Sequence, residues 1–107
     1  MTFEVRITET AQKDLEEIFD YISVDLQNPL AADRILTCLE GEILGLDTMP
    51  ERFRLYPSEP WHSRGLRVMK VEHYLVFYLT DKEEKTVTVI RVMYGGRDTE
   101  TELQKNI

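Results

Sequence analysis

The hydrophobic pattern of this 107-residue chain predicts an α+β fold with the element order β-α-α-β-β-β. Alternating apolar residues near the N-terminus are typical of a strand, and two later stretches space their apolar residues three and four apart, as amphipathic helices do. Three β-rich runs joined by short connections follow from residue 65. Because connections this short force antiparallel neighbours, we expect an antiparallel sheet covered on one face by a helical hairpin.

The first strand is predicted at the N-terminus, where the side chains alternate in character. Its apolar residues are Phe3, Val5 and Ile7, and polar residues separate them. A period of two places the apolar side chains on one face of a strand. We therefore expect this strand to be half-buried.

The first helix is predicted after Thr8 or Thr10, either of which can cap its N-terminus. Its apolar stripe recurs at helical spacing and consists of Leu15, Ile18, Phe19, Ile22 and Leu26. We expect the acidic side chains in this stretch to face water; they are Asp14, Glu16, Glu17 and Asp20.

The second helix is predicted to start at Asn28 and Pro29, a capping residue followed by proline at the first helical position. Its buried stripe consists of Ala32, Ile35, Leu36, Leu39, Ile43 and Leu46. Met49 and Pro50 end it. The turn between the two helices is short enough to require an antiparallel helical hairpin.

The remaining strands are predicted at residues 65–72, 74–80 and 86–93. An irregular loop at 51–64 precedes them and is rich in arginine and aromatic residues. Such a loop either binds a partner or uses Phe53, Tyr56 and Trp61 to hold itself on the core, and the sequence favours neither interpretation. The polar stretch 99–107 is expected to be a mobile tail or a weak last turn of helix.

The charge is distributed unevenly between the two halves of the chain. Residues 1–50 hold 3 basic and 11 acidic side chains, a net charge of −8, whereas residues 51–98 hold 9 basic and 7 acidic ones, a net charge of +2. The total of −7 disfavours a nucleic-acid binder, which is usually basic. A nuclease nevertheless remains an alternative, because five cations lie close together in the sequence: Arg52, Arg54, Arg64, Arg67 and Lys70.

Several classes of protein are disfavoured by composition. No apolar run is long enough to span a bilayer, and the N-terminus does not resemble a signal peptide, so we expect a soluble, cytoplasmic protein. The single cysteine, Cys38, rules out an intrachain disulfide. Together with His62 and His73 it forms no recognisable zinc spacing, so we expect no metal and no cofactor.

Several short motifs, in order along nearly the whole chain, resemble the RelE/ParE superfamily of toxins from bacterial type II toxin–antitoxin modules. These motifs are D-L-E-E-I-F-D-Y-I at 14–22, N-P-x-A-A at 28–32, M-P at 49–50, G-L-R at 65–67, Y-L-V-F-Y at 74–78 and R-V-x-x-G-G-R-D at 91–98. The resemblance implies a RelE/ParE-like toxin domain at residues 1–98 with a polar C-terminal tail at 99–107. It also implies a growth-arresting toxin that a cognate antitoxin holds inactive.

One branch of the resembled superfamily consists of ribosome-dependent messenger-RNA endonucleases that work without metal. These enzymes place lysines and arginines on the central strand, where they activate the 2′-hydroxyl and stabilise the phosphorane. The corresponding positions here are Leu66 and Val68, with Lys70 retained, and Leu75 follows Tyr74. If this chain is a nuclease, the remaining candidates for catalysis are Lys70, Arg67, Tyr94 and Arg97.

The other branch resembles ParE, a plasmid-stabilisation toxin that inhibits DNA gyrase and needs no catalytic residues of its own. The long helical hairpin and the strand without nuclease lysines favour this branch. An inert relative that only binds the antitoxin is a third alternative. The residues expected to bind partners on the sheet side are Arg64, Arg67, Lys70, Arg91, Tyr94 and Arg97.

The partners implied by the resemblance are a cognate antitoxin and either gyrase or the ribosome with its message, with no membrane involved. The resemblance leaves the assembly open between a homodimer and a heterotetramer with the antitoxin.

Overall fold

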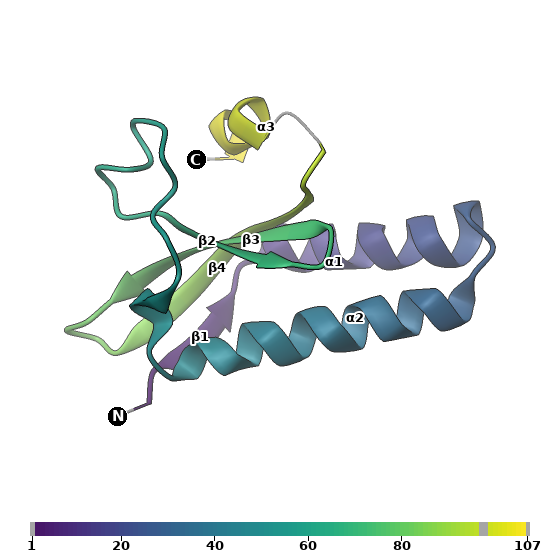
Figure 1. The fold of residues 1–107 in the computed structure, drawn as a ribbon, viewed down its shortest axis with the longest axis horizontal. Coiled ribbons are helices and arrows are strands. Elements are labelled where there is room, and N and C mark those ends of the chain that lie inside the picture. Colours follow the sequence, from purple (N-terminus) through teal and green to yellow (C-terminus); the bar gives the residue numbers. More distant parts are fainter. Residues whose placement is uncertain (1, 97–98, 107) are drawn as a thin grey trace.

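The computed structural model describes residues 2–96 and 99–106 and contains one four-stranded sheet with three α-helices (Figure 1). The elements are β1 (Glu4–Ile7), α1 (Glu9–Asp20), the π-helical turn η1 (Tyr21–Asp25), α2 (Pro29–Leu44), the 3₁₀ turns η2 (Gly45–Asp47) and η3 (Pro50–Arg52), β2 (Arg67–Val71), β3 (Tyr74–Asp81), β4 (Thr86–Tyr94) and α3 (Thr99–Asn106). The predicted α+β class is confirmed, and so is the predicted order β-α-α-β-β-β of the main helices and strands.

The sheet has the strand order β1-β4-β3-β2 and is mixed. Strands β2, β3 and β4 are antiparallel as predicted, because short turns join them. The prediction of a wholly antiparallel sheet was wrong at β1, which runs parallel to β4 with Glu4 opposite Thr86 and Ile7 opposite Val89. In the sequence, α1 and α2 separate β1 from β2, so no short connection fixes the direction of β1.

The helix starts predicted from capping residues are confirmed. The Thr8 side chain accepts a hydrogen bond from Ala11 N at 3.1 Å, and that of Asn28 accepts one from Ala31 N at 3.2 Å. The stripe of α1 ends earlier than predicted, because Leu26 is 55 % exposed. The π-turn η1 changes the helical phase just before Leu26, and the hairpin extends past the edge of the sheet there (Figure 1).

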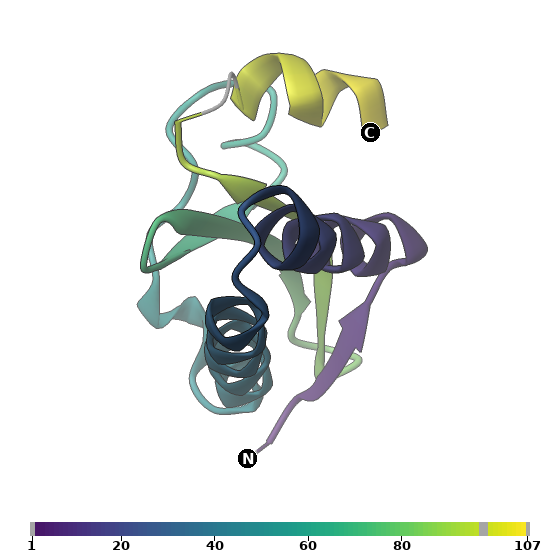
Figure 2. The ribbon, with the colours of Figure 1, turned by 90° about the vertical axis from the view of Figure 1, so that its right-hand side faces the viewer.

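The helical hairpin covers one face of the sheet, as predicted, and other segments cover the opposite face. The first cluster of buried residues lies between the helical hairpin and the sheet and includes Leu15, Leu39, Ile43, Val76 and Tyr78. On the opposite face a second cluster consists of Tyr56, Trp61, Leu66, Val68, Phe77, Met93 and Leu103. Figure 2 shows α2 on one side of the sheet, with the loop before β2 and α3 on the other.

The loop at 51–64 and the C-terminal stretch supply the second cover. Two interpretations of this loop were open, and burial of Tyr56 and Trp61 confirms that these two rings hold the loop on the core. The C-terminal stretch forms an eight-residue helix, α3, which is more than the mobile tail or weak turn that was predicted. Its Leu103 is fully buried, and Tyr56 Oη lies 3.3 Å from Thr99 Oγ1. One leucine in a polar stretch was too weak a signal to predict this docking.

Alkaline pH is expected to destabilise the fold through Tyr78. Its hydroxyl donates to the Pro50 carbonyl inside the core, and burial raises the pKa of Tyr78 from 10.0 to about 12. A raised folded-state pKa stabilises the fold fully below pH 10 and loses that contribution as the pH rises to 12. We expect roughly 3 kcal/mol of unfolding free energy to be lost over this window.

Urea unfolding of wild type and Tyr78→Phe at neutral and alkaline pH checks this expectation. At neutral pH the unfolding free energy of Tyr78→Phe should be about 1 kcal/mol below that of wild type, because the variant lacks the hydrogen bond to Pro50. Above pH 10 its unfolding free energy should fall less steeply than that of wild type. A smaller slope persists, because burial also raises the pKa of Tyr74. Phe77→Leu, a change at a buried residue that does not titrate, is the control: it should lower stability by a similar amount at every pH and keep the wild-type slope. Parallel profiles for Tyr78→Phe and wild type would contradict the expectation.

Candidate functional site

A buried ion pair between Asp14 on α1 and Arg91 on β4 lies where the helix meets the sheet. The Arg91 side chain donates from Nε to Asp14 Oδ2 at 2.7 Å and from Nη2 to Oδ1 at 3.0 Å. Asp14 Oδ2 also accepts the backbone N–H of Val92 at 2.9 Å. The two residues are 7 % and 6 % exposed. The prediction that Asp14 faces water was therefore wrong, because this carboxylate satisfies a backbone donor of β4 beyond the end of β1.

Arg91 also reaches the C-terminal helix. Its Nη1 donates to the Glu102 carbonyl at 3.1 Å, so one guanidinium joins α1, β4 and α3. Hydrogen bonding to Asp14 raises the pKa of Arg91, and the guanidinium remains charged at every accessible pH. Bidentate pairing of this kind fixes orientation as well as charge. Arg91 was predicted to bind a partner; in this structure its donors are used within the chain.

Arg67 is likewise tied to the chain. Its Nη1 donates to the Phe53 carbonyl at 2.7 Å and to the Glu51 carbonyl at 3.3 Å. Arg67 lies opposite Tyr78, whose hydroxyl binds the Pro50 carbonyl. Both side chains therefore hold the segment that leads from α2 into the loop.

Lys70 and Tyr94 lie on opposite faces of the sheet. Lys70 pairs with Leu75, and Leu75 pairs with Met93 of the second cluster. Lys70 therefore lies on the face of the second cluster. Tyr94 is opposite Tyr74 on the face of the helical hairpin, and the two rings meet edge to face at 5.7 Å. A lysine and a tyrosine on opposite faces cannot act on one phosphate.

The other two predicted residues are Arg64 and Arg97. Arg64 is exposed and stacks over the Trp61 ring at 5.3 Å, whereas Arg97 lies outside the described residues. Among the described candidates, no hydrogen bond, ion pair or ring contact joins one to another. Their roles in binding or catalysis stay predictions.

An apolar groove of about 800 Å³ opens between the helical hairpin and the ends of β3 and β4. The sequence analysis did not predict it. Its exposed apolar surface comes from Tyr21, Leu26 and Tyr94, which are 54 %, 55 % and 50 % exposed. Leu26 leaves the buried stripe at the π-turn, whereas Tyr21 is not part of that stripe. An aromatic residue outside the apolar stripe of the predicted helix is the signal in the sequence that could have indicated the groove.

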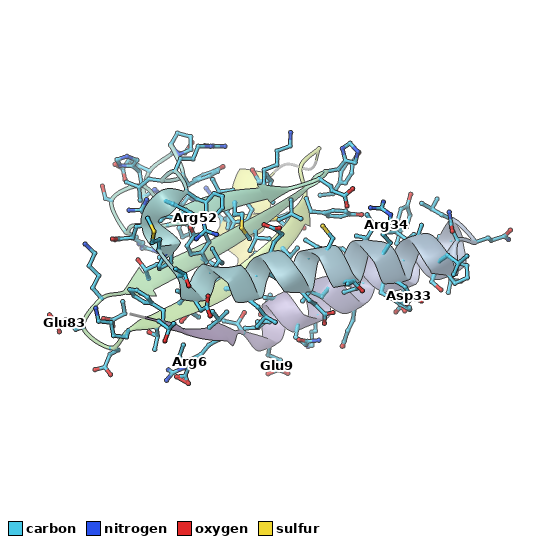
Figure 3. All side chains as sticks on the ribbon, turned by 60° about the horizontal axis from the view of Figure 1, so that its bottom comes forward. Arg6, Glu9, Asp33, Arg34, Arg52 and Glu83 are labelled. Atoms are coloured by element: carbon cyan, nitrogen blue, oxygen red, sulfur yellow. The ribbon has the colours of Figure 1, made fainter. Side chains whose placement is uncertain are left out.

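Charged side chains border this groove. Arg34 of α2 donates from Nη1 to Glu72 Oε1 at 3.1 Å and to Oε2 at 3.2 Å, which connects α2 with the β2–β3 turn at the mouth of the groove. Figure 3 shows Arg34 pointing toward the sheet and the neighbouring Asp33 pointing away from it. Glu17 lines the groove from α1 and is exposed. The groove is thus apolar at its centre and mainly acidic at its rim.

Within residues 2–96 and 99–106, no three histidine, cysteine or acidic side chains gather closely enough to hold a metal ion. No helix in that same part of the chain is long and apolar enough to cross a bilayer. The arrangement suits binding, since the groove beside the hairpin is apolar and the ion pair of Asp14 and Arg91 is buried.

Solved structures of known proteins share this fold. A protein of the chromosomal ParDE toxin–antitoxin system of P. aeruginosa has a TM-score of 0.70 and 21 % identity, covering 87 % of this chain and 96 % of that one. A chain of the RelBE2 toxin–antitoxin complex of Mycobacterium tuberculosis has a TM-score of 0.67 and 26 % identity, with 88 % and 92 % covered. A mutant of the E. coli toxin RelE in the free state has a TM-score of 0.66 and 15 % identity, with 99 % and 94 % covered.

The fold is therefore that of toxins from type II toxin–antitoxin systems. Residues 5–99 match the family described as the ParE toxin of the type II toxin–antitoxin system parDE, and the chain belongs to this family. No curated protein sequence matches the chain. The resemblance to the RelE/ParE superfamily seen in the sequence is confirmed.

Removing one partner of the buried ion pair is expected to destabilise the fold strongly. Asp14→Ala leaves the Arg91 guanidinium buried without its counter-charge, which should cost about 3–5 kcal/mol of unfolding free energy. Glu17→Ala, an exposed acid on the same helix, is the matched control and should change stability by less than about 0.5 kcal/mol. Denaturant unfolding at neutral pH measures both variants.

The double variant Asp14→Leu with Arg91→Met separates charge burial from packing. It should be less destabilised than the sum of the two single variants, because neither charge is left unpaired. Additive losses, or equal losses in Asp14→Ala and Glu17→Ala, would show that the pair does not act as a unit.

Proposed function

We propose that this protein arrests bacterial growth by binding DNA gyrase and that a cognate antitoxin neutralises it. Membership of the ParE toxin family carries the proposal. Such a toxin works through contact surface and needs no catalytic residues of its own. The exposed apolar groove and the engaged arginines of this chain are consistent with that requirement.

The positions where a nuclease of the superfamily holds its catalytic cations support a binding role. Leu66 and Val68 are buried in the second cluster beneath the loop and α3. Apolar side chains there cannot transfer a proton or stabilise a charged phosphorane. Arg67 donates to the Phe53 carbonyl and Arg91 donates to Asp14. On β2 the exposed cation is therefore Lys70.

The apolar groove is the surface we assign to the antitoxin. The P. aeruginosa relative comes from a ParDE toxin–antitoxin system, and the M. tuberculosis relative was solved in a complex named as toxin and antitoxin. A groove between a helical hairpin and a sheet suits an amphipathic helix that inserts apolar anchors. Tyr21, Leu26 and Tyr94 offer enough exposed apolar surface for such anchors.

Ribosome-dependent messenger-RNA cleavage is the second candidate. Two observations favour it: the fold is shared with the E. coli toxin RelE, and Lys70 remains exposed on the face opposite the helical hairpin. The apolar side chains of Val68 and Leu75 beside Lys70 cannot transfer a proton, and this ranks messenger-RNA cleavage below gyrase binding.

Controlled expression of the chain alone in a bacterial host tests both candidates. We expect growth to stop, with DNA breaks and an SOS response within minutes, while translation continues at first. Co-expression of the small protein encoded beside the chain should restore growth. Rapid loss of translation, with cuts at the ribosomal A site that vanish in Lys70→Ala, would favour the nuclease instead, and normal growth at high expression would contradict toxicity.

The groove is tested by placing a charge on its exposed apolar surface. Leu26→Glu should weaken antitoxin binding by at least about tenfold, because burying a leucine side chain contributes roughly 2 kcal/mol. Leu44→Glu is the matched control, since Leu44 is also a largely exposed helix leucine but does not line the groove. Calorimetry with the purified antitoxin measures both variants. Equal affinities for the two would show that the antitoxin binds elsewhere.

A further inference from the structure

Three tyrosine side chains line the apolar groove that we assign to the antitoxin. Tyr21 comes from the π-turn after α1, whereas Tyr74 begins β3 and Tyr94 ends β4. Tyr74 and Tyr94 pair across the two strands, and their ring centroids are 5.7 Å apart with the ring planes at 76°. Burial raises the pKa of Tyr74, and the nearby phenols of Tyr94 and Tyr21 raise it further. The three rings therefore gather in one part of the groove, which we call the tyrosine corner.

The ring of Tyr94 is held in place although this residue is 50 % exposed. A Cβ atom on Gly96 would lie 2.9 Å from Cε2 of the Tyr94 ring, so only glycine lets the chain pass this close to it. The His73 ring in the β2–β3 turn lies 6.5 Å from that of Tyr94, and the Gly95 N–H donates to the His73 carbonyl at 2.8 Å. A ring that the fold already fixes loses little entropy when a ligand binds to it. Tyr94 is therefore a preformed contact surface.

The charged side chains beside the tyrosine corner are paired within the chain, with one exception among the described residues. Asp14 is bound by Arg91 in the buried ion pair. Arg34 is bound to Glu72 at the mouth of the groove. Glu17 lines the groove and is exposed, and no described residue forms a hydrogen bond or an ion pair with its carboxylate. The groove therefore combines aromatic rings with an uncompensated negative charge.

We propose that the tyrosine corner binds the charged end of an arginine or lysine side chain of the antitoxin. Cations bind over the faces of aromatic rings, and this attraction is stronger where water is excluded. Long basic side chains also have apolar stems, which suit a groove lined by Leu26 and Ile35. The carboxylate of Glu17 supplies the counter-charge. The proposal rests on the assignment of the groove to the antitoxin, and it adds that one anchor of the inserted helix is cationic.

A cationic anchor gives the groove a means to discriminate between partners. A helix with only apolar anchors would cover Glu17 and remove water from its carboxylate without offering a counter-charge, which costs free energy. An acidic anchor would in addition be repelled. The tyrosine corner therefore distinguishes between helices whose apolar faces are alike.

The probe for this site is Nα-acetyl-arginine methylamide, and the control is the citrulline derivative, which has nearly the same shape without the charge. NMR titrations of the full chain follow the tyrosine ring signals. The arginine probe should shift the signals of Tyr21, Tyr74 and Tyr94 and bind at least about threefold more tightly than the citrulline probe. Equal binding of the two probes, or no shift at these rings, would overturn the proposal. This test uses the chain alone, so its outcome is independent of toxicity.

Variants separate the aromatic faces from the charge. Tyr94→Leu and Glu17→Gln should each remove most of the preference for arginine over citrulline, whereas Tyr94→Phe keeps the ring and should keep the preference. Gly96→Ala should lower the preference, because the added methyl group displaces the Tyr94 ring. Glu16→Gln is the matched control for Glu17→Gln and should behave as wild type, since Glu16 is an exposed acid of the same helix that does not line this groove. An unchanged preference in both Tyr94→Leu and Glu17→Gln would contradict the proposal.

Calorimetry with the purified antitoxin tests the same residues in the complex. Tyr94→Leu should bind at least about tenfold more weakly than wild type, and Tyr94→Phe should bind within about twofold of it. Equal losses in these two variants would assign the effect to the hydroxyl group and overturn the proposal. If Leu26→Glu loses binding while Tyr94→Leu binds as wild type does, the groove remains the antitoxin surface and only the cationic anchor is wrong.

Discussion

The buried pair of Asp14 and Arg91 is the interaction on which the arrangement of the other elements depends. Strand β1 pairs with β4 only as far as Val89, and beyond that point β4 would present unpaired backbone groups to the interior. Asp14 accepts the Val92 N–H there and neutralises Arg91 at the same time. An unpaired donor or charge at that depth would cost several kcal/mol, so helix α1 must lie along this part of β4.

The same guanidinium connects the two sides of the sheet. Through the Glu102 carbonyl, Arg91 holds α3 against the face opposite the helical hairpin, where Leu103 completes the second cluster. Arg67 has a comparable role at the other end of the sheet, because it binds the carbonyls that lead from η3 into the loop. The basic character of the sheet half therefore serves in large part to hold covering segments in place.

This use of arginine limits what the surface can do. Cations that bind backbone carbonyls and a buried carboxylate are not free to contact a phosphate. The accessible feature is instead an apolar groove beside the hairpin, and such a groove suits a protein partner.

The sequence by itself determined the class of fold, the helix starts and the direction of three strands. These features depend on local causes: capping at Thr8 and Asn28, helical spacing of apolar residues, and connections too short for parallel pairing. The motifs spread along the chain also sufficed to indicate the superfamily. Local pattern failed where a polar residue had a distant reason to be buried, since Asp14 has the same spacing as the water-facing acids of its helix.

Only the tertiary structure decided the direction of β1, the burial of Asp14, the docking of α3 and the presence of the groove. Each depends on contacts between residues far apart in the chain, such as Arg91 with Asp14 or Leu103 with the second cluster. The placement of the predicted site residues was decided in the same way, because strand register put Lys70 and Tyr94 on opposite faces of the sheet. A sequence specifies which side chains are present, but pairing across the sheet determines which of them bind within the chain and which stay exposed for a partner.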